Sequence, residues 1–327
     1  MRLSELTRSL RSFMGIQRKR PIRTIVQSLP AVDPLIGRIL GDFGEDSAII
    51  DCFQKGDLLL FHSDGIQPEF VELDPWGAGY FGVVVNVKDI VVLGGIPVAM
   101  LDILSYTNTR IMKEVLKGLR DGCRKFRVPI VGGHVHPKAP YNSLTVAIVG
   151  LTEKRRMLTS SGAEPGDKIV LAIDLKGKIW PKWVYGWDTT SMKNAEQVQS
   201  QFMVPVKIAE NHLAKAGKDI SNAGVLGSLG IMLEIERLGA SINLNHIPKP
   251  KDIPIDHWLK VNPGFGFVYA TDRSRAENCL NIFKKHDIAA AVIGEVDDTC
   301  RLKITDGRRS VTAFDFRVDY ITGIRYR

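Results

Sequence analysis

The 327-residue sequence has no apolar run long enough to span a bilayer. The longest candidate, GVVVNVKDIVVLGGIPVAMLDIL, is broken by Lys88 and Asp89 well before the roughly 18 uninterrupted apolar residues that a membrane helix needs. The four cysteines lie far apart, without C-x-x-C spacing. We therefore expect a cytoplasmic protein with reduced thiols and no membrane association.

Two common nucleotide-binding motifs are also missing. The sequence contains no G-x-x-x-x-G-K-[ST] loop, and no G-x-G-x-x-G follows an apolar strand. A mitochondrial transit peptide is not favoured either, because Glu5 and the lack of a small-residue cleavage pattern argue against it. If this chain binds ATP, another arrangement of residues must hold the phosphates.

Positive charge is in excess, with a formal net charge of +8. Seven basic residues near the N-terminus contribute to it: Arg2, Arg8, Arg11, Arg18, Lys19, Arg20 and Arg23. Such a charge suits RNA, an acidic membrane surface or a polyphosphate ligand. No basic strand with interleaved aromatic residues supports RNA, so nucleic acid is the least favoured partner. Leu3, Leu6, Leu10 and Phe13 recur at helical spacing, which also fits a docked amphipathic helix with a solvated basic face.

The first half of the chain predicts a mixture of strands and helices. Residues 47–53 and 57–65 read as two strands with a hairpin-length connection. Residues 108–127 predict a helix that Asn108 caps. Residues 128–137 predict a strand that ends in a Gly-Gly loop, and residues 143–152 predict a further strand.

A change of character near residue 155 predicts a domain boundary, which gives domains 1–155 and 156–327. In the second half we expect a helix that ends at Gly217, a helix over 224–239 and a helix opened by a capping box at 274–277. Two strands should flank the turn at 306–307. A tryptophan-rich loop is expected soon after the domain boundary, with Trp180, Trp183 and Trp187. It would cover a substrate or pack at the domain interface.

Carboxylates recur where apolar runs meet glycine or a polar turn. Glu45 and Asp46 are adjacent, and Asp64, Asp89 and Asp219 occupy similar contexts. Two like charges about 4 Å apart repel by roughly 4 kcal/mol at an effective dielectric near 20, so a site that gathers them needs a cation or a proton. Hard oxygen ligands without cysteine favour Mg²⁺ held together with substrate phosphates. Each aspartate taken singly is also compatible with a helix cap or a turn.

Two uncertain segments bear on this hypothesis. If residues 79–93 are helical, Asn86 and Asp89 share a face, but the many valines there favour a strand. Glycine-rich stretches, VGGH at 131–134 and GVLGSLG at 224–230, would let backbone N–H groups approach phosphates.

The ordered motifs GEDSAII, HSDGI, NVKDIVVLGGIP, VGGH and DISNAG resemble those of the AIR-synthase-related, PurM-like ATP-binding superfamily. Its members include aminoimidazole ribonucleotide synthase, thiamine-monophosphate kinase, selenophosphate synthetase and a hydrogenase-maturation protein. The segments DPWGAGYFGVVVNVKDI, VGGHVHP, WDTT and KDISNAG are most similar to an uncharacterised branch that includes methanogenesis-marker proteins.

The resemblance implies a PurM-like two-domain α+β fold, with an N-terminal domain that dimerises through its sheet and a C-terminal domain of mixed sheet and helices. It also implies ATP in the cleft, with its phosphates bridged to Mg²⁺. The implied metal ligands are Asp46, Asp64, Asp89 and Asp219. The implied nucleotide-binding set adds Glu45, Asn86, Gly132, Gly133, Ser221 and Asn222.

Three positions depart from the superfamily pattern. Glu45 stands where an aspartate is usual, His134 replaces the aspartate of Gly-Gly-Asp, and Asn222 replaces the second acid of Asp-Ile-Ser-Asp. Two negative charges are lost, which puts the number of metal ions in doubt and argues against a plain thiamine-monophosphate kinase.

Three residues are candidates for catalysis. His134 suits a general acid or base, a phosphate contact or, with His136, a metal ligand; a structural histidine is the alternative. Lys19 and Lys88 would neutralise phosphate charge, although Lys19 also fits a solvated basic face.

These observations predict an ATP- and Mg²⁺-dependent homodimeric enzyme that transfers, or activates with, a phosphoryl group on an unidentified small-molecule substrate. The alternatives are a nucleotide-binding assembly or maturation factor without small-molecule turnover, and an activity like that of thiamine-monophosphate kinase.

Overall fold

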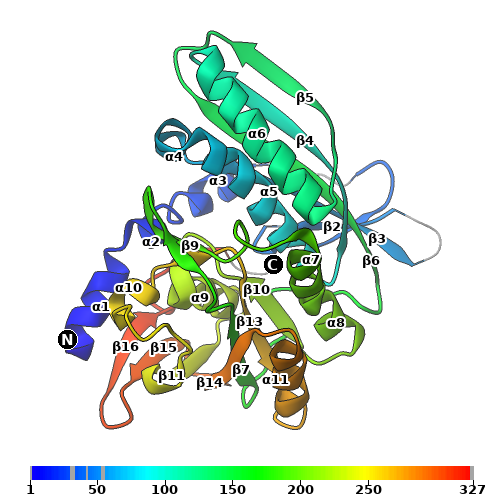
Figure 1. The fold of residues 1–327 in the computed structure, drawn as a ribbon. Helices are drawn as coiled ribbons and strands as arrows, with labels where there is room; N and C mark the ends of the chain where they lie inside the picture. The colour runs from blue at the N-terminus through cyan, green and yellow to red at the C-terminus, as the bar shows by residue number, and fades with distance from the viewer. Residues whose placement is uncertain (1, 30–33, 42, 53–55, 325–327) are drawn as a thin grey trace.

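The computed structural model describes residues 2–29, 34–41, 43–52 and 56–324, which build two large sheets, a small three-stranded sheet and their helices (Figure 1). A six-stranded sheet is formed mainly by the first half of the chain, and a seven-stranded sheet by the second half. This arrangement confirms the α+β prediction. No helix in these residues is both long and apolar enough to cross a membrane.

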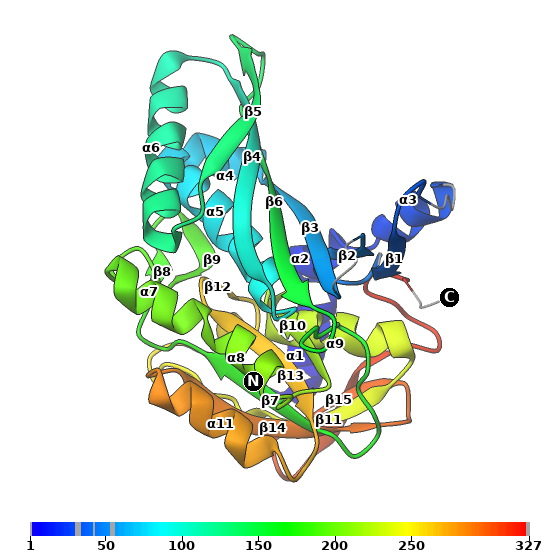
Figure 2. The ribbon, with the colours of Figure 1, turned by 90° about the vertical axis from the view of Figure 1, so that its right-hand side faces the viewer.

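The first sheet is antiparallel except for its last pair, β4 and β5. Its order is β1 (Arg38–Gly41), β2 (Ala48–Asp51), β3 (Asp57–Ile66), β6 (Ser143–Glu153), β4 (Ile96–Tyr106) and β5 (Ile130–Pro137). Helices α4 (Pro68–Leu73), α5 (Pro75–Val91) and α6 (Thr109–Phe126) cover one face (Figure 2). The predicted strands 47–53 and 57–65 pair with each other as β2 and β3, which confirms that prediction. Residues 53–55, which include most of their connection, lie outside the described residues.

Residues 79–91, for which the sequence left helix and strand open, belong to helix α5. Its valines are buried between the sheet and α6, and this burial outweighs their strand propensity. Small residues allow the two helices to approach closely: a Cβ on Gly79 would lie 2.1 Å from the carbonyl oxygen of Val115, and one on Gly118 would lie 2.0 Å from that of Trp76.

Both faces of the second sheet are covered. Its order is β10 (Ala216–Asp219), β13 (Gly266–Thr271), β7 (Lys168–Ile173), β14 (Ala289–Asp297), β11 (Gly239–Asn243), β15 (Arg301–Thr305) and β16 (Ser310–Asp315). On β7, Leu171 faces a core shared with α1 (Leu3–Arg11) and α9 (Gly224–Glu236). Its neighbour Val170 faces a core shared with α8 (Val204–Glu210) and α11 (Ala276–Lys285). This alternation follows from the two-residue period of a strand.

The N-terminal segment runs along the second sheet towards the start of α9. Leu6 and Leu10 of α1 are buried, which confirms the predicted amphipathic helix, and Arg11 Nε donates to the carbonyl oxygen of Ala313 at 2.6 Å. In α2 (Met14–Gln17), a Cβ on Gly15 would lie 1.9 Å from the carbonyl oxygen of Asn222. Only glycine therefore allows this segment to lie so close to the turn before α9.

Several local predictions are confirmed. The side chain of Asn108 accepts hydrogen bonds from the backbone N–H groups of Arg110 and Ile111 at the start of α6. Helix α9 begins at Gly224, and β15 and β16 flank the predicted turn.

Four local predictions were wrong. Gly132 and Gly133 lie inside β5, because their backbone pairs with β4 instead of turning. The helix expected to reach Gly217 ends at Glu210, since residues 216–219 pair with β13 as strand β10.

The other two concern a cap and a loop. Helix α11 begins at Ala276 without a side-chain cap, so the expected capping box at 274–277 is not formed. The tryptophan-rich segment is a hairpin of β8 (Lys178–Trp180) and β9 (Trp183–Asp188), which pairs with β12 (Asn262–Pro263) in a small three-stranded sheet.

Candidate functional site: a cluster of buried carboxylates

Four segments bring charged side chains together between the two sheets. The turn before β2 supplies Asp46, β3 supplies Asp64, α5 supplies Asp89 and β10 supplies Asp219. The aspartates predicted to converge thus lie in two overlapping groups.

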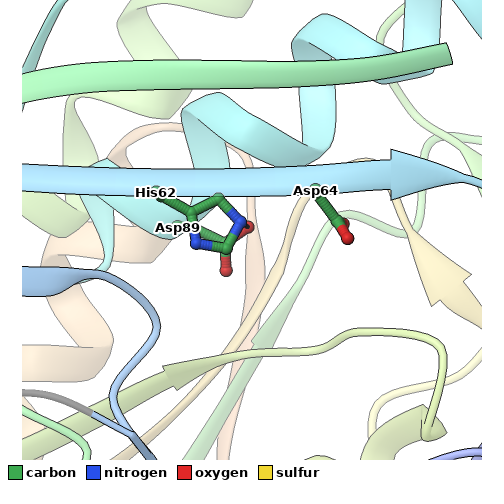
Figure 3. A group of neighbouring side chains, drawn as sticks. All are labelled: His62, Asp64 and Asp89. Carbon is green, nitrogen blue, oxygen red and sulfur yellow. Dashed lines mark ion pairs between the residues drawn. The ribbon is translucent and has the colours of Figure 1, made fainter. Parts of the chain in front are cut away.

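The first group consists of His62, Asp64 and Asp89, each of which offers a ligand atom within 4.8 Å of the others. Figure 3 shows that the side chains of His62 and Asp64 extend from the same side of β3, with Asp89 beside the His62 ring. They share a face because they are two residues apart on a strand. His62 Nε2 lies 3.2 Å from Asp89 Oδ2, without the angles of a hydrogen bond.

The second group consists of Asp46, Asp89 and Asp219, whose ligand atoms also lie within 4.8 Å of one another. All three are buried. Asp46 forms an ion pair with Lys218 and accepts a hydrogen bond from the backbone N–H of Asp219 at 3.2 Å. Asp89 belongs to both groups and is therefore the centre of the cluster.

Burial and mutual repulsion disfavour ionisation of most carboxylates in this cluster. Burial raises the pKa of Asp46 to about 6 and also raises the pKa of Asp64. The pKa of Asp89 is raised well above its usual value by burial and by repulsion from Asp219, Asp46 and Asp64. Burial opposes ionisation of Asp219 as well, but Lys88 and Lys218 outweigh it and lower the pKa.

Hard carboxylate oxygens with an uncompensated charge are the donors that Mg²⁺ prefers. The four aspartates face two buried lysines, Lys88 and Lys218, so a divalent cation would complete the balance of charge. Burial also lowers the pKa of His62, which keeps this ring neutral and able to act as a ligand or an acceptor. The residues present therefore fit a magnesium ion.

Lys88 is fully engaged with protein groups. Its ammonium group donates to the carbonyl oxygens of Ile220 at 2.7 Å and Pro263 at 3.0 Å, and lies 3.1 Å from Asp219 Oδ2. Only 1% of the residue is exposed. The contacts tie α5 to the second sheet and fix the position of Asp219.

Most of the remaining predicted nucleotide residues near the cluster contact the protein itself, although Asn86 Oδ1 is buried without a hydrogen-bond partner among the described residues. Glu45 accepts hydrogen bonds from the backbone N–H of Ser160 at 2.5 Å and from Ser161 Oγ at 3.4 Å. Asn86 is buried and donates to the carbonyl oxygen of Gly82, four residues earlier on α5. Ser221 and Asn222 form the turn that leads from β10 into α9.

Lys19 reaches the cluster from the N-terminal segment. It is half-buried, and its positive charge opposes the upward effect of burial on the pKa values of Asp64 and Asp219. The structure thus brings this predicted residue close to the acids.

By contrast, Gly132, Gly133 and His134 do not meet the cluster within one chain. Strand β5 is separated from β3 by β6 and β4. His134 pairs with Ile103, which is exposed on the face away from α5, and its ring lies 4.7 Å from that of His136.

Sequence reasoning missed His62 and Lys218. His62 precedes Asp64 by two residues on a predicted strand, so strand alternation would have placed both on one face. Lys218 adjoins Asp219, and only the pairing of β10 with the second sheet shows that it meets Asp46.

Two family models match this chain: the N-terminal domain of AIR synthase related protein over residues 44–152, and its C-terminal domain over residues 164–307. Together they cover most of the sequence. The chain belongs to the AIR synthase related family and has its PurM-like fold.

Individual relatives support this assignment. An uncharacterised protein of Methanocaldococcus jannaschii is 42% identical over 324 residues, which is 99% of this chain and 100% of that protein. Thermotoga maritima PurL complexed with ATP superposes with a TM-score of 0.76 at 18% identity, over 92% of this chain and 49% of PurL. AaThiL complexed with AMPPCP and TMP superposes with a TM-score of 0.64 at 18% identity, over 96% of this chain and 99% of that one. This chain therefore spans about half of PurL.

The charge excess generates a prediction for stability. With Asp46 at a pKa of about 6 against 3.8 for the ordinary group, the folded metal-free chain binds this proton more tightly than the unfolded chain does. The stability contributed by the protonated group is full below pH 3.8 and is lost as the pH rises to about 6. Asp89 acts in the same direction.

We expect Asp89→Asn to stabilise the metal-free protein at neutral pH by about 1 kcal/mol, because it removes a buried charge beside other acids. Denaturant unfolding at acidic pH and at neutral pH measures the effect, with exposed Asp252→Asn as the control. An Asp89→Asn chain less stable than the control at neutral pH would contradict the charge excess.

Proposed function

We propose that this chain is an ATP- and Mg²⁺-dependent cytoplasmic enzyme that transfers, or activates with, a phosphoryl group on a small molecule. The observation that carries the proposal is the convergence of Asp46, Asp64, Asp89 and Asp219 with an excess of negative charge. A metal–triphosphate complex is the ligand that such a site suits best, because phosphate oxygens complete a magnesium shell that one or two carboxylates begin.

The relatives support the nucleotide. Two solved structures of similar fold are nucleotide complexes, PurL with ATP and AaThiL with AMPPCP. Sequence identity to both proteins is 18%, so the choice of acceptor is not carried over from either of them.

Each charged residue has a role in the proposal. The four aspartates would supply the ligands that hold Mg²⁺, and the ion would supply charge neutralisation at the phosphates. Lys19 adds a positive charge from the N-terminal segment, where it acts on Asp64 and Asp219. Lys88 and Lys218 position Asp219 and Asp46. At the turn before α9, the backbone N–H of Ser221 donates to Ser228 Oγ at 3.0 Å and that of Gly224 donates to the carbonyl oxygen of Ser221 at 2.9 Å, so these two groups are not available to phosphate oxygens.

We further propose a homodimer built through the open face of the first sheet. This face exposes a patch of apolar side chains: Phe61, Val98, Leu101, Ile103 and Leu151. Helices cover the opposite face (Figure 2). Contiguous apolar surface of this kind marks an interaction site. Gly132, Gly133 and His134 lie at its edge, so any nucleotide contact they make is proposed to come from the partner copy.

Calorimetry with ATP and Mg²⁺ tests the nucleotide site. The wild-type chain should bind ATP only when Mg²⁺ is present, and Asp64→Asn combined with Asp89→Asn should weaken binding by at least about tenfold, because the bridging ligands are lost. Asp252→Asn serves as the surface control.

Unchanged binding in the double variant would contradict the metal bridge. Turnover separates the alternatives: release of ADP dependent on a small acceptor supports the enzyme, whereas bound ATP without turnover favours an assembly or maturation factor. Thiamine monophosphate belongs in the acceptor panel to test the kinase-like alternative.

The dimer is tested by placing a charge in the patch. Ile103→Lys should convert the protein to a monomer in analytical ultracentrifugation, because it buries a charge at the interface. Leu116→Lys on α6 is the matched control, since Leu116 is 45% exposed and Ile103 is 48% exposed. The interface would be excluded if the wild-type protein is a monomer. It would also be excluded if the Ile103→Lys variant remains a dimer.

A further inference from the structure

An aromatic pocket adjoins the carboxylate cluster at the end of β3. It is formed where the β8–β9 hairpin, β12, α4 and α5 come together. Its lining includes Asp64, Gln67, Phe70, Trp180, Trp183 and Asn262. Asp64 is shared with the cluster, so the pocket opens directly beside the proposed metal.

The aromatic walls are held in place before any ligand binds. Trp180 is 5% exposed, and its indole N–H donates to Asp74 Oδ2 at 2.8 Å. One ring contact links it to Trp76, stacked at 5.9 Å between centroids, and another to Phe81, edge-on at 4.9 Å. Trp183 lies 5.4 Å from Phe70 and is more exposed. The hairpin thus presents one fixed wall and one more accessible wall.

Polar atoms occupy the other side of the pocket. Three carboxamides line it, from Gln67, Asn222 and Asn262. The carbonyl oxygen of the Gln67 side chain is buried and has no hydrogen-bond partner among the described residues. Asn262 donates to Asn222 Oδ1 at 3.1 Å. An unpartnered buried acceptor calls for a donor from a ligand or an ordered water.

The charge of the lining restricts the ligand. Asp64 is its one ionisable side chain, and none of the described lining residues is a lysine or an arginine. A phosphate would find no positive partner there. Several aromatic rings beside a carboxylate instead suit a flat group that is neutral or positive, since aromatic faces attract both rings and cations.

We propose that this pocket binds an uncharged or cationic planar ring of the second substrate, with a hydrogen-bond donor directed at Gln67. The proposal deepens, and rests on, the proposed phosphoryl-transfer function. The ring is assigned to the acceptor because it touches Asp64, a proposed ligand of the metal that binds the terminal phosphates. In ATP the ribose and the α-phosphate separate the adenine from those phosphates.

The test uses three probes with the 327-residue chain: benzamide, the 1-methylnicotinamide cation and the non-planar cyclohexanecarboxamide. Ligand-observed NMR titrations measure their binding, with and without saturating ATP and Mg²⁺. Trp183→Ala should weaken binding of the planar probes by about fivefold, which is the scale of one lost aromatic contact. Trp183→Phe should retain most of the binding, and Val184→Ala, outside the pocket and 60% exposed, should leave it unchanged.

Binding of at least one planar probe that depends on the Trp183 ring and persists with ATP and Mg²⁺ would support the proposal. The proposal is overturned if no planar probe binds, if cyclohexanecarboxamide binds equally well, or if Trp183→Ala has no effect. Displacement by ATP and Mg²⁺ would also overturn it, because the pocket would then hold the adenine.

Calorimetry of ATP and Mg²⁺ on the same variants keeps the two proposals apart. Trp183→Ala should retain the wild-type affinity for ATP. A wild-type chain that binds rings but not ATP contradicts the proposed function, whereas one that binds ATP but not rings contradicts only the acceptor pocket.

Discussion

The chemistry of the site depends on the close approach of four carboxylates between the two large sheets, three of them buried and Asp64 half-buried. Asp46, Asp64, Asp89 and Asp219 come from segments up to 173 residues apart in the chain, and two buried lysines do not balance their charge. Repulsion among buried acids raises the pKa of Asp89 and destabilises the folded state. A protein that keeps such a cluster gives up stability for a ligand that neutralises it, which is the common pattern at functional sites.

The fold holds the acids in position by linking its two halves through the same residues. Lys88 extends from α5 into carbonyl groups around β10 and β12, and Lys218 extends back to Asp46. The N-terminal segment adds Lys19 and packs Gly15 against the turn before α9. The cluster is therefore rigid on the side of the second sheet. On the other side it opens into the pocket walled by Trp180 and Trp183.

Much of this arrangement could be predicted from sequence, because ordered motifs place acids at strand ends and helix starts. The fold class, the N-terminal helix, the cap at Asn108 and the convergence of the aspartates were all accessible in this way. Local signals left residues 79–93 open between helix and strand, and burial of most valines of α5 decides for the helix. The errors arose where tertiary pairing overrides local signals: Gly132 and Gly133 are extended because β4 pairs with them. Partners such as Lys218 for Asp46 depend on long-range strand pairing, which no local pattern encodes.

The most direct test of the central claim is to locate a divalent ion in crystals. Mn²⁺ replaces Mg²⁺ at oxygen sites and is visible by anomalous scattering, so crystals grown with Mn²⁺ and AMPPCP should show an anomalous peak bound by Asp89 and at least one of Asp46, Asp64 and Asp219. Terminal phosphate oxygens should complete its coordination. Ordered AMPPCP elsewhere, or aspartates without a metal at saturating Mn²⁺, would contradict the account.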